Sequence, residues 1–163
     1  KLIEILQQHQ TPLTEDTSTV RRWSMACVAL PTCGLAITES ERRLPGIIDS
    51  LEAPLAKLGL DKERFTIRMT GCPNGCARPY NADLALVGKA KNKYTLFAGG
   101  GWLGTRLAYI YKDLVTDDTV ADEIIGIFAA FKAHREGDES LGDFCARVGA
   151  DDLAVMAESA PKP

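Results

Sequence analysis

The sequence has 163 residues, of which 45% are apolar and 25% are charged, and its net charge at pH 7 is −3. This length is enough for one domain with a hydrophobic core, and the composition is that of an ordinary globular protein. The small negative charge argues against binding to nucleic acid or to an anionic membrane, and no apolar stretch is long enough to span a bilayer.

The first 60 residues predict two helices, with a linker and a strand between them. In chain order we expect a short helix over residues 2–10, a polar linker over 11–19, a buried strand over 23–30 and a helix over 39–58. The last of these has apolar residues at helical spacing, and Gly59 stands where a C-terminal cap would be. Pro45 and Pro54 are expected to split or kink this helix.

The remainder of the chain predicts several strands and one long helix. The expected strands cover residues 65–70, 84–87, 94–97 and 144–148. The apolar face of the helix consists of Val120, Ile124, Ile127, Phe128 and Phe131. Thr116 or Asp117 is expected to cap its beginning, and Gly137 to end it. This order of elements favours an α+β fold class with a mixed β-sheet and flanking helices.

Five cysteines occur, and four of them form two close pairs. The pairs are Cys27 with Cys33 and Cys72 with Cys76. An odd number of cysteines argues against a closed disulfide framework, which a chain of this length does not need. Cys145 stands alone on an apolar stretch that we expect to be a buried strand, so we interpret it as a core residue.

Three interpretations of the paired cysteines remain open on spacing alone. They could be buried free thiols, although Cys72 and Cys76 flank a Pro-Asn-Gly turn that projects side chains outward. They could bind structural zinc, but the C-x5-C spacing is wider than the usual knuckle, and His9 and His134 lie in distant helical segments. They could hold an iron–sulfur cluster, which tolerates more varied loops. The spacing favours the cluster.

The segments CVALPTC at 27–33 and TGCPNGC at 70–76 resemble the paired signatures of the sulfite and nitrite reductase hemoproteins. CVALPTC resembles the assimilatory sulfite reductases, because nitrite reductases carry other residues between the first two cysteines. Further similarity is found at 39–42, 78–79, 86–89, 104–106 and 142–144. The resemblance covers roughly residues 23–149 and implies the fold of that family's [4Fe–4S] domain.

The resemblance implies that Cys27, Cys33, Cys72 and Cys76 hold a [4Fe–4S] cluster, with Cys76 also bound to the iron of siroheme. It implies six-electron reduction of sulfite to sulfide, with electrons supplied by ferredoxin or a flavoprotein reductase. Arg-Pro-Tyr after Cys76 favours the ferredoxin-dependent type. Siroheme carries many carboxylates, and we expect Asn74, Arg78 and Arg106 to contact them.

The chain resembles only the second of the two halves of these enzymes. The substrate-gripping basic cluster of the family belongs to the amino-terminal half, so we expect that half to be a partner and the chain alone to be inactive. We expect residues 1–20 to be a helix and linker of the preceding subdomain, 21–149 the cofactor-binding domain, and 150–163 a carboxy-terminal tail. Because the chain lacks an initial Met, its targeting cannot be read, and we expect the cytoplasm. A siroheme nitrite reductase fragment and a non-catalytic four-cysteine zinc module are the alternatives.

Residues 99–104, GGGWLG, formally match the G-x-G-x-x-G pattern of dinucleotide-binding sites. Such a site also needs a helix that begins at the glycines and a second parallel strand that carries an acidic residue. The residues that follow predict at most a turn or so of helix, over 105–111. We therefore expect a glycine bend at the edge of the sheet.

Overall fold

A computed structural model describes residues 1–161 and 163 of the chain. Its described α-helices are α1 (Leu2–Gln8), α2 (Thr19–Arg22), α3 (Leu44–Lys57), α4 (Val120–His134), α5 (Leu141–Val148) and α6 (Ala150–Ser159). Two 3-10 helices, η1 (Thr14–Asp16) and η2 (Pro79–Asn81), lie in connecting segments. The strands are β1 (Met25–Ala26), β2 (Ile67–Thr70), β3 (Leu84–Ala90), β4 (Lys93–Ala98) and β5 (Tyr109–Thr116).

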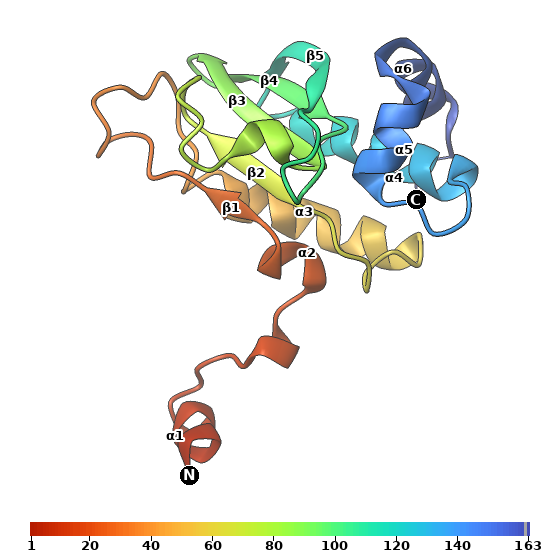
Figure 1. Cartoon of the computed structure of the whole chain (residues 1–163). Coiled ribbons are helices and arrows are strands. Elements are labelled where there is room, and N and C mark those ends of the chain that lie inside the picture. The colour runs from red at the N-terminus through yellow and green to blue at the C-terminus, as the bar shows by residue number, and fades with distance from the viewer. Residues whose placement is uncertain (162) are drawn as a thin grey trace.

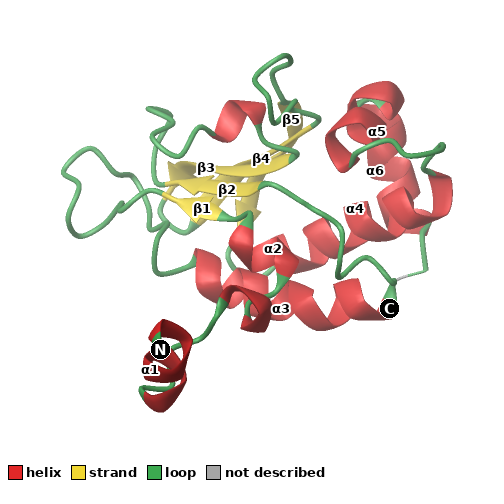
Figure 2. Ribbon diagram, turned by 60° about the horizontal axis from the view of Figure 1, so that its bottom comes forward, coloured by secondary structure: helices red, strands yellow, loops and turns green. Residues whose placement is uncertain are grey.

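The five strands form one mixed sheet in the order β1-β2-β3-β4-β5. β1, β2 and β3 are parallel to one another, while β4 is antiparallel to both β3 and β5. Helix α3 lies beneath the sheet, and α4 runs beside α3 (Figures 1 and 2). Helices α5 and α6 lie together at the right of Figure 1, next to α4. The predicted α+β fold class with a mixed sheet and flanking helices is confirmed.

The hydrophobic core lies between the sheet and helices α3 and α4. Ile67 and Met69 of β2 contribute to it from the sheet, and the ring of Phe65 lies 4.8 Å from that of Phe128 on α4. Because side chains alternate along a strand, Arg68 and Thr70 lie on the opposite face of β2.

The opposite face is covered by a loop rather than by long helices. The chain that leaves β2 runs through Cys72 and Cys76 into η2, and Tyr80 of η2 packs edge-on against Phe97 of β4, with ring centroids 5.4 Å apart. The cysteine loop is therefore itself part of the cover of the sheet.

Helix α1 projects away from the rest of the molecule, and the two views agree on this (Figures 1 and 2). None of its residues is buried, and the side chains of Leu2, Ile3 and Ile5 are exposed. Among the described residues, no helix has the combination of length and apolar character that crossing a membrane requires.

Two predictions for the carboxy-terminal part are wrong. Residues 144–148, expected as a strand, belong to helix α5, where Leu141, Phe144 and Cys145 recur at helical spacing behind the N-cap Ser140, whose Oγ accepts from the Asp143 N–H at 3.2 Å. Residues 150–159, expected as part of a tail, form helix α6. Gly149, with φ of 82°, makes the turn between these two helices.

Four other elements differ from the sequence-based expectation in their length, their type or their continuity. The expected strand over 23–30 is reduced to β1, because the chain leaves the sheet edge at Cys27 and enters a loop. The short helical turn considered over 105–111 is absent from the described residues, which instead enter β5 at Tyr109. Helix α3 runs unbroken through Pro54, and Pro45 lies in its first turn, where an N–H is not needed. Helix α4 ends at His134 rather than near Gly137.

Candidate metal centre at the cysteine loops

All four paired cysteines line one cavity of about 270 Å³. Its lining residues are Ala26, Cys27, Val28, Ala29, Cys33, Leu35, Ala36, Cys72, Asn74 and Cys76. All five cysteines of the chain are free thiols. Two pairs separated by 38 residues in the sequence are therefore brought together in space.

The parallel sheet accounts for the meeting of the first cysteines of each pair. Cys27 directly follows β1 and Cys72 follows β2, and the carboxyl ends of parallel neighbours lie at the same edge of a sheet. The Cys27 N–H donates to the Met69 carbonyl at 3.0 Å, which continues the pairing of the two strands.

Short loops return the second cysteine of each pair to the cavity. The Cys33 N–H donates to the Ala29 carbonyl at 2.7 Å, and Ala29 adopts a positive φ of 46°. In the other loop Gly75 has a φ of 69°, a conformation that suits glycine. Cys72 is buried, Cys27 and Cys33 are half-buried, and Cys76 is exposed. One sulfur of the four is thus open to a group outside the loop.

The arrangement of the four thiols bears on the choice between one metal ion and a cluster. Across residues 1–161 and 163, no three His, Cys, Asp or Glu side chains are placed to hold a single metal ion. A structural zinc requires four ligands within about 2.3 Å of one centre. The cavity and its thiolate-forming groups therefore fit a polynuclear cluster better than they fit one ion.

The backbone of Gly71 supplies a hydrogen bond to one of these sulfurs. Its N–H donates to Cys27 Sγ at 3.3 Å, and its carbonyl accepts from the N–H groups of Ile37 and Thr38 at 2.8 and 3.1 Å. The loop before α3 thereby holds the backbone that precedes Cys72.

The other predicted site residues occupy three different environments. Asn74 lines the cysteine cavity and is exposed. Arg78 is exposed and lines a neighbouring hollow of about 270 Å³, together with Gly75, Tyr80, Asn81, Gly104 and Leu107. Arg106 lines neither; its Nε donates to the Gly99 carbonyl at 2.7 Å and its Nη2 pairs with Asp143 at 2.8 Å. The structure thus brings Asn74 to the cysteines and engages Arg106 elsewhere.

Arg68 is a residue of this region that the sequence analysis missed. Its side chain is 8% exposed, and Nη1 donates to the Arg78 carbonyl at 2.9 Å and to Asn81 Oδ1 at 2.7 Å. Burial and the nearby Arg78 lower the pKa of the Arg68 guanidinium, and Asp83 opposes this. Arg68 therefore holds the chain that leaves Cys76. A lone arginine within the apolar strand Ile67–Thr70 was the available signal.

Tyr80 closes the same loop from the side. Its hydroxyl donates to the Pro73 carbonyl at 2.8 Å. Burial, with a smaller contribution from Cys72, raises the pKa of the Tyr80 hydroxyl. The hydroxyl therefore remains a hydrogen-bond donor further into the alkaline range than an ordinary tyrosine hydroxyl does.

Cys145 lies apart from the cavity. It is fully buried in α5, and this burial raises the pKa of its thiol far above the ordinary value. Its interpretation as a core residue is confirmed, although it lies on a helix and not on a strand.

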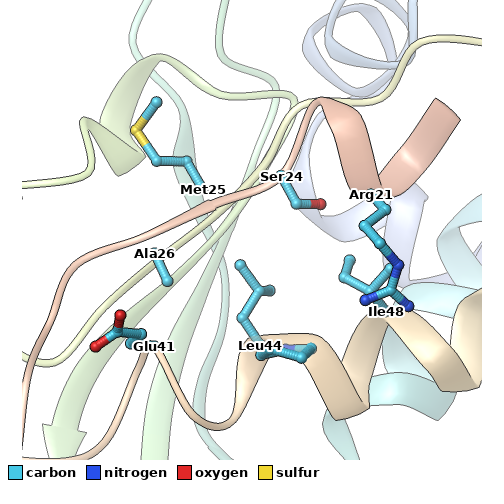
Figure 3. A pocket seen from close by; sticks show the side chains of 8 residues that line it. Arg21, Ser24, Met25, Ala26, Glu41, Leu44 and Ile48 are labelled. Carbon is cyan, nitrogen blue, oxygen red and sulfur yellow. The ribbon is translucent and has the colours of Figure 1, made fainter. Parts of the chain in front are cut away.

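A second cavity, of about 240 Å³, lies between β1 and the beginning of α3. Figure 3 shows Ser24 and Leu44 at this cavity, with Arg21 beside Ile48 and Met25 on the far side of the strand. Arg21 is already paired with Asp49 and, at 3.1 Å, with Glu52. The arginine is thus neutralised by its own neighbours.

The glycine segment 99–104 joins the antiparallel strands β4 and β5. It forms the predicted bend beside the sheet edge, and no helix among the described residues begins there. The strand–turn–helix geometry of a dinucleotide site is therefore not formed by these residues.

Residues 20–161 match the family described as the nitrite and sulphite reductase 4Fe-4S domain. The chain belongs to this family. The 4Fe-4S domain is 49% identical over 156 residues to a sulfite reductase [ferredoxin] of Synechococcus elongatus, covering 96% of the chain and 25% of that protein. It is 46% identical over 149 residues to a sulfite reductase [NADPH] hemoprotein beta-component of Methylocella silvestris, covering 91% of the chain and 26% of that protein. The domain therefore spans about a quarter of the length of these relatives.

Solved structures agree with this assignment. The NirA protein of Mycobacterium tuberculosis superposes on the 4Fe-4S domain with a TM-score of 0.80 and 26% identity, over 93% of the chain and 30% of NirA. A dissimilatory sulfite reductase I superposes with a TM-score of 0.69 at 12% identity, over 99% of the chain and 57% of that chain, which shows the shared fold alone. The predicted resemblance to the sulfite and nitrite reductase family is confirmed.

Proposed function

We propose that the chain is the cluster-binding part of an assimilatory sulfite reductase, and that Cys27, Cys33, Cys72 and Cys76 are the ligands of its [4Fe–4S] cluster. The observation that carries this proposal is the single cavity that these four thiols line. The arrangement of the ligands counts against the zinc module, because no described group of three or more His, Cys, Asp or Glu side chains is placed for one ion.

We propose further that Cys76 is shared with the iron of siroheme. Its exposure supports this role, because a shared sulfur must be reachable from outside the loop, whereas Cys72 is buried. When bound, the two cofactors supply the electron transfer and the reducible iron centre. The protein supplies position: Arg68 and Tyr80 hold the loop around Cys76, and the Gly71 N–H donates to Cys27 Sγ.

Asn74 and Arg78 are the side chains that we propose for the carboxylates of siroheme. Both are exposed beside Cys76, with an amide and a cation to offer. Arg106 would have only its two Nη1 hydrogens and one Nη2 hydrogen to offer, since its Nε donates to the Gly99 carbonyl and its Nη2 donates once to Asp143.

The relatives of the chain support a proposal for the substrate and the partners of the whole enzyme. We propose sulfite as the substrate, with six electrons supplied by ferredoxin or by a flavoprotein reductase, since both kinds of sulfite reductase are similar to this chain. We propose that the amino-terminal half of the same enzyme completes the site, as the resemblance to enzymes built of two halves implies. The boundary of the domain at residues 20 and 21, the fragment's inactivity and the cytoplasmic location remain predictions.

The test is anaerobic reconstitution of the chain with iron and sulfide, followed by metal analysis and a visible spectrum. About four irons and four sulfides per chain, the stoichiometry of a cubane, are expected. One zinc per chain without iron uptake would overturn the proposal. With the complete enzyme, turnover of nitrite in preference to sulfite would favour the nitrite reductase alternative.

A further inference from the structure

Gly88 lies in β3 and is not one of the residues that line the cysteine cavity. Val87 pairs with Thr70 in the parallel ladder, so the residues that follow, Gly88 and Gly71, lie side by side. A methyl group on Gly88 would lie 2.3 Å from the Gly71 carbonyl oxygen and 2.8 Å from Thr38 Cγ2. Gly88 does not have a positive φ, so this contact, rather than backbone conformation, is what excludes a side chain.

The Gly71 carbonyl cannot turn away from such a contact without moving the rest of the residue, because both of its backbone polar groups are hydrogen-bonded and its Cα is closely surrounded. Its carbonyl accepts from Ile37 and Thr38, and its N–H donates to Cys27 Sγ. A methyl group on Gly71 itself would lie 2.5 Å from the Thr38 carbonyl oxygen and 2.7 Å from the Ala29 Cβ. A push on the Gly71 carbonyl would therefore move the residue as a unit and draw its N–H away from the sulfur.

That N–H has an electrostatic consequence for any cluster held by Cys27. A donor directed at a ligand sulfur stabilises negative charge, and the reduced cluster carries one more negative charge than the oxidised one. Hydrogen bonds to the sulfurs are among the factors that set the reduction potential of such clusters. Loss of the Gly71 donor would lower that potential.

We propose that Gly88 is a positioning residue for the cysteine site. Because it has no side chain, the Gly71 N–H stays on Cys27 Sγ, and the reduction potential of the cluster is thereby raised. The geometric part of this inference is the effect of Gly88 on the hydrogen bond from the Gly71 N–H to Cys27 Sγ, and it concerns the protein alone. The redox part is the effect on the reduction potential of the cluster, and it rests on the proposed function.

The geometric part is tested on the metal-free chain by amide hydrogen exchange, resolved by NMR. In Gly88→Ala we expect the Gly71 N–H to exchange roughly tenfold faster, as the loss of one hydrogen bond implies. Gly34→Ala is the matched control: Gly34 follows a cysteine, and a methyl group there would meet nothing within 4 Å. We expect no change at Gly71 in that variant.

Cys27→Ala keeps the test decisive if Gly88→Ala does not fold. It removes the acceptor sulfur at a half-buried position, and the Gly71 N–H should again exchange about tenfold faster. Unchanged exchange at Gly71 in Cys27→Ala, or in folded Gly88→Ala, would overturn the inference.

The redox part is tested on the reconstituted chain by a titration monitored by electron paramagnetic resonance. The cluster of Gly88→Ala should have a lower reduction potential than wild type, and that of Gly34→Ala an equal one. Equal potentials in all three would overturn the inference while leaving the proposed function intact. Failure of the wild type to take up iron would count against the proposed function instead, and amide exchange would then decide the role of Gly88.

Discussion

One face of the sheet packs against helices α3 and α4, whereas the opposite face is covered by the loop that carries Cys72 and Cys76. The first face is made of apolar side chains, such as Ile67 and Met69, that are completely buried. On the second face, Arg68 Nε and Thr70 Oγ1 are buried and have no hydrogen-bond partner among the residues that the structure describes. The helix-covered face supplies most of the apolar burial, and the loop-covered face carries the residues suited to chemistry.

The largest effect on stability is expected on the helix-covered face. Phe128→Ala should lower the free energy of unfolding by about 3–5 kcal/mol, because it removes a fully buried ring that packs on Phe65. Urea unfolding monitored by circular dichroism measures this. A loss below about 1 kcal/mol would mean that the core is not organised around these rings.

Tyr94 joins the core to the loop before α3 and should make stability sensitive to alkaline pH. Its ring is in the core, its hydroxyl donates to the Glu39 carbonyl at 2.8 Å, and burial raises its pKa from 10.0 to about 12. Because the folded pKa lies above the unfolded one, the native state keeps a proton that the unfolded state releases. Stability is therefore kept below pH 10 and lost between about pH 10 and 12, by roughly 2–3 kcal/mol.

Unfolding measured in urea from pH 8 to pH 12 tests this dependence. In Tyr94→Phe the free energy of unfolding should fall less steeply with rising pH than in wild type. A remainder should persist, because burial also raises the pKa of Tyr109 and of Tyr111. If the free energy of unfolding fell equally steeply with pH in Tyr94→Phe and in wild type, Tyr94 would not contribute to the alkaline loss of stability.

A smaller effect on stability is expected on the loop-covered face. Arg68→Met keeps the apolar stem but leaves the Arg78 carbonyl and Asn81 Oδ1 unpaired, at a cost of about 1–2 kcal/mol. Because the loop that leaves Cys76 loses its anchor, iron uptake per folded molecule should also fall. Arg135→Met, which breaks an ion pair with Glu63 on the surface, is the control and should leave iron uptake unchanged.

The smallest change in stability is expected for Cys76→Ser, which alters an exposed side chain. Its free energy of unfolding without metal should stay within about 0.5 kcal/mol of wild type, yet siroheme ligation in the complete enzyme should be abolished.

Cys145→Ser should leave bound iron unchanged. If Cys145→Ser alone emptied the site, the ligand assignment would fail.

Sequence patterns were informative wherever one physical constraint dominated. The alternation in residues 65–70 and the helical spacing from Val120 to Phe131 each reflect one buried face, so β2 and α4 were predicted with small errors at their ends. The cysteine pairs meet in one cavity as predicted, although whether all four bind metal remains a prediction.

Other elements depend on partners that a sequence pattern does not reveal. Phe144-Cys145-Ala146-Arg147-Val148 is a short apolar run that could be either strand or helix, and only its packing behind Ser140 decides it. Helix α6 approaches α4 through small residues: a methyl group on Gly126 would lie 2.9 Å from the Ala157 carbonyl oxygen. Alternation places Arg68 on the far face of β2, but nothing in the strand indicates that a loop would bury it.

The brevity of β1 has a thermodynamic consequence. Two residues at a sheet edge, paired with β2 alone, are among the first to open in local fluctuations. Cys27 and Cys33 follow β1, so a cofactor that requires all four thiols binds only molecules in which this edge is closed. Binding therefore stabilises the closed edge by mass action. The gain in free energy grows with the logarithm of the ratio between the ligand concentration and its dissociation constant. The amino-terminal edge of the sheet should accordingly be the part of the domain whose amide protection rises most when the site is filled.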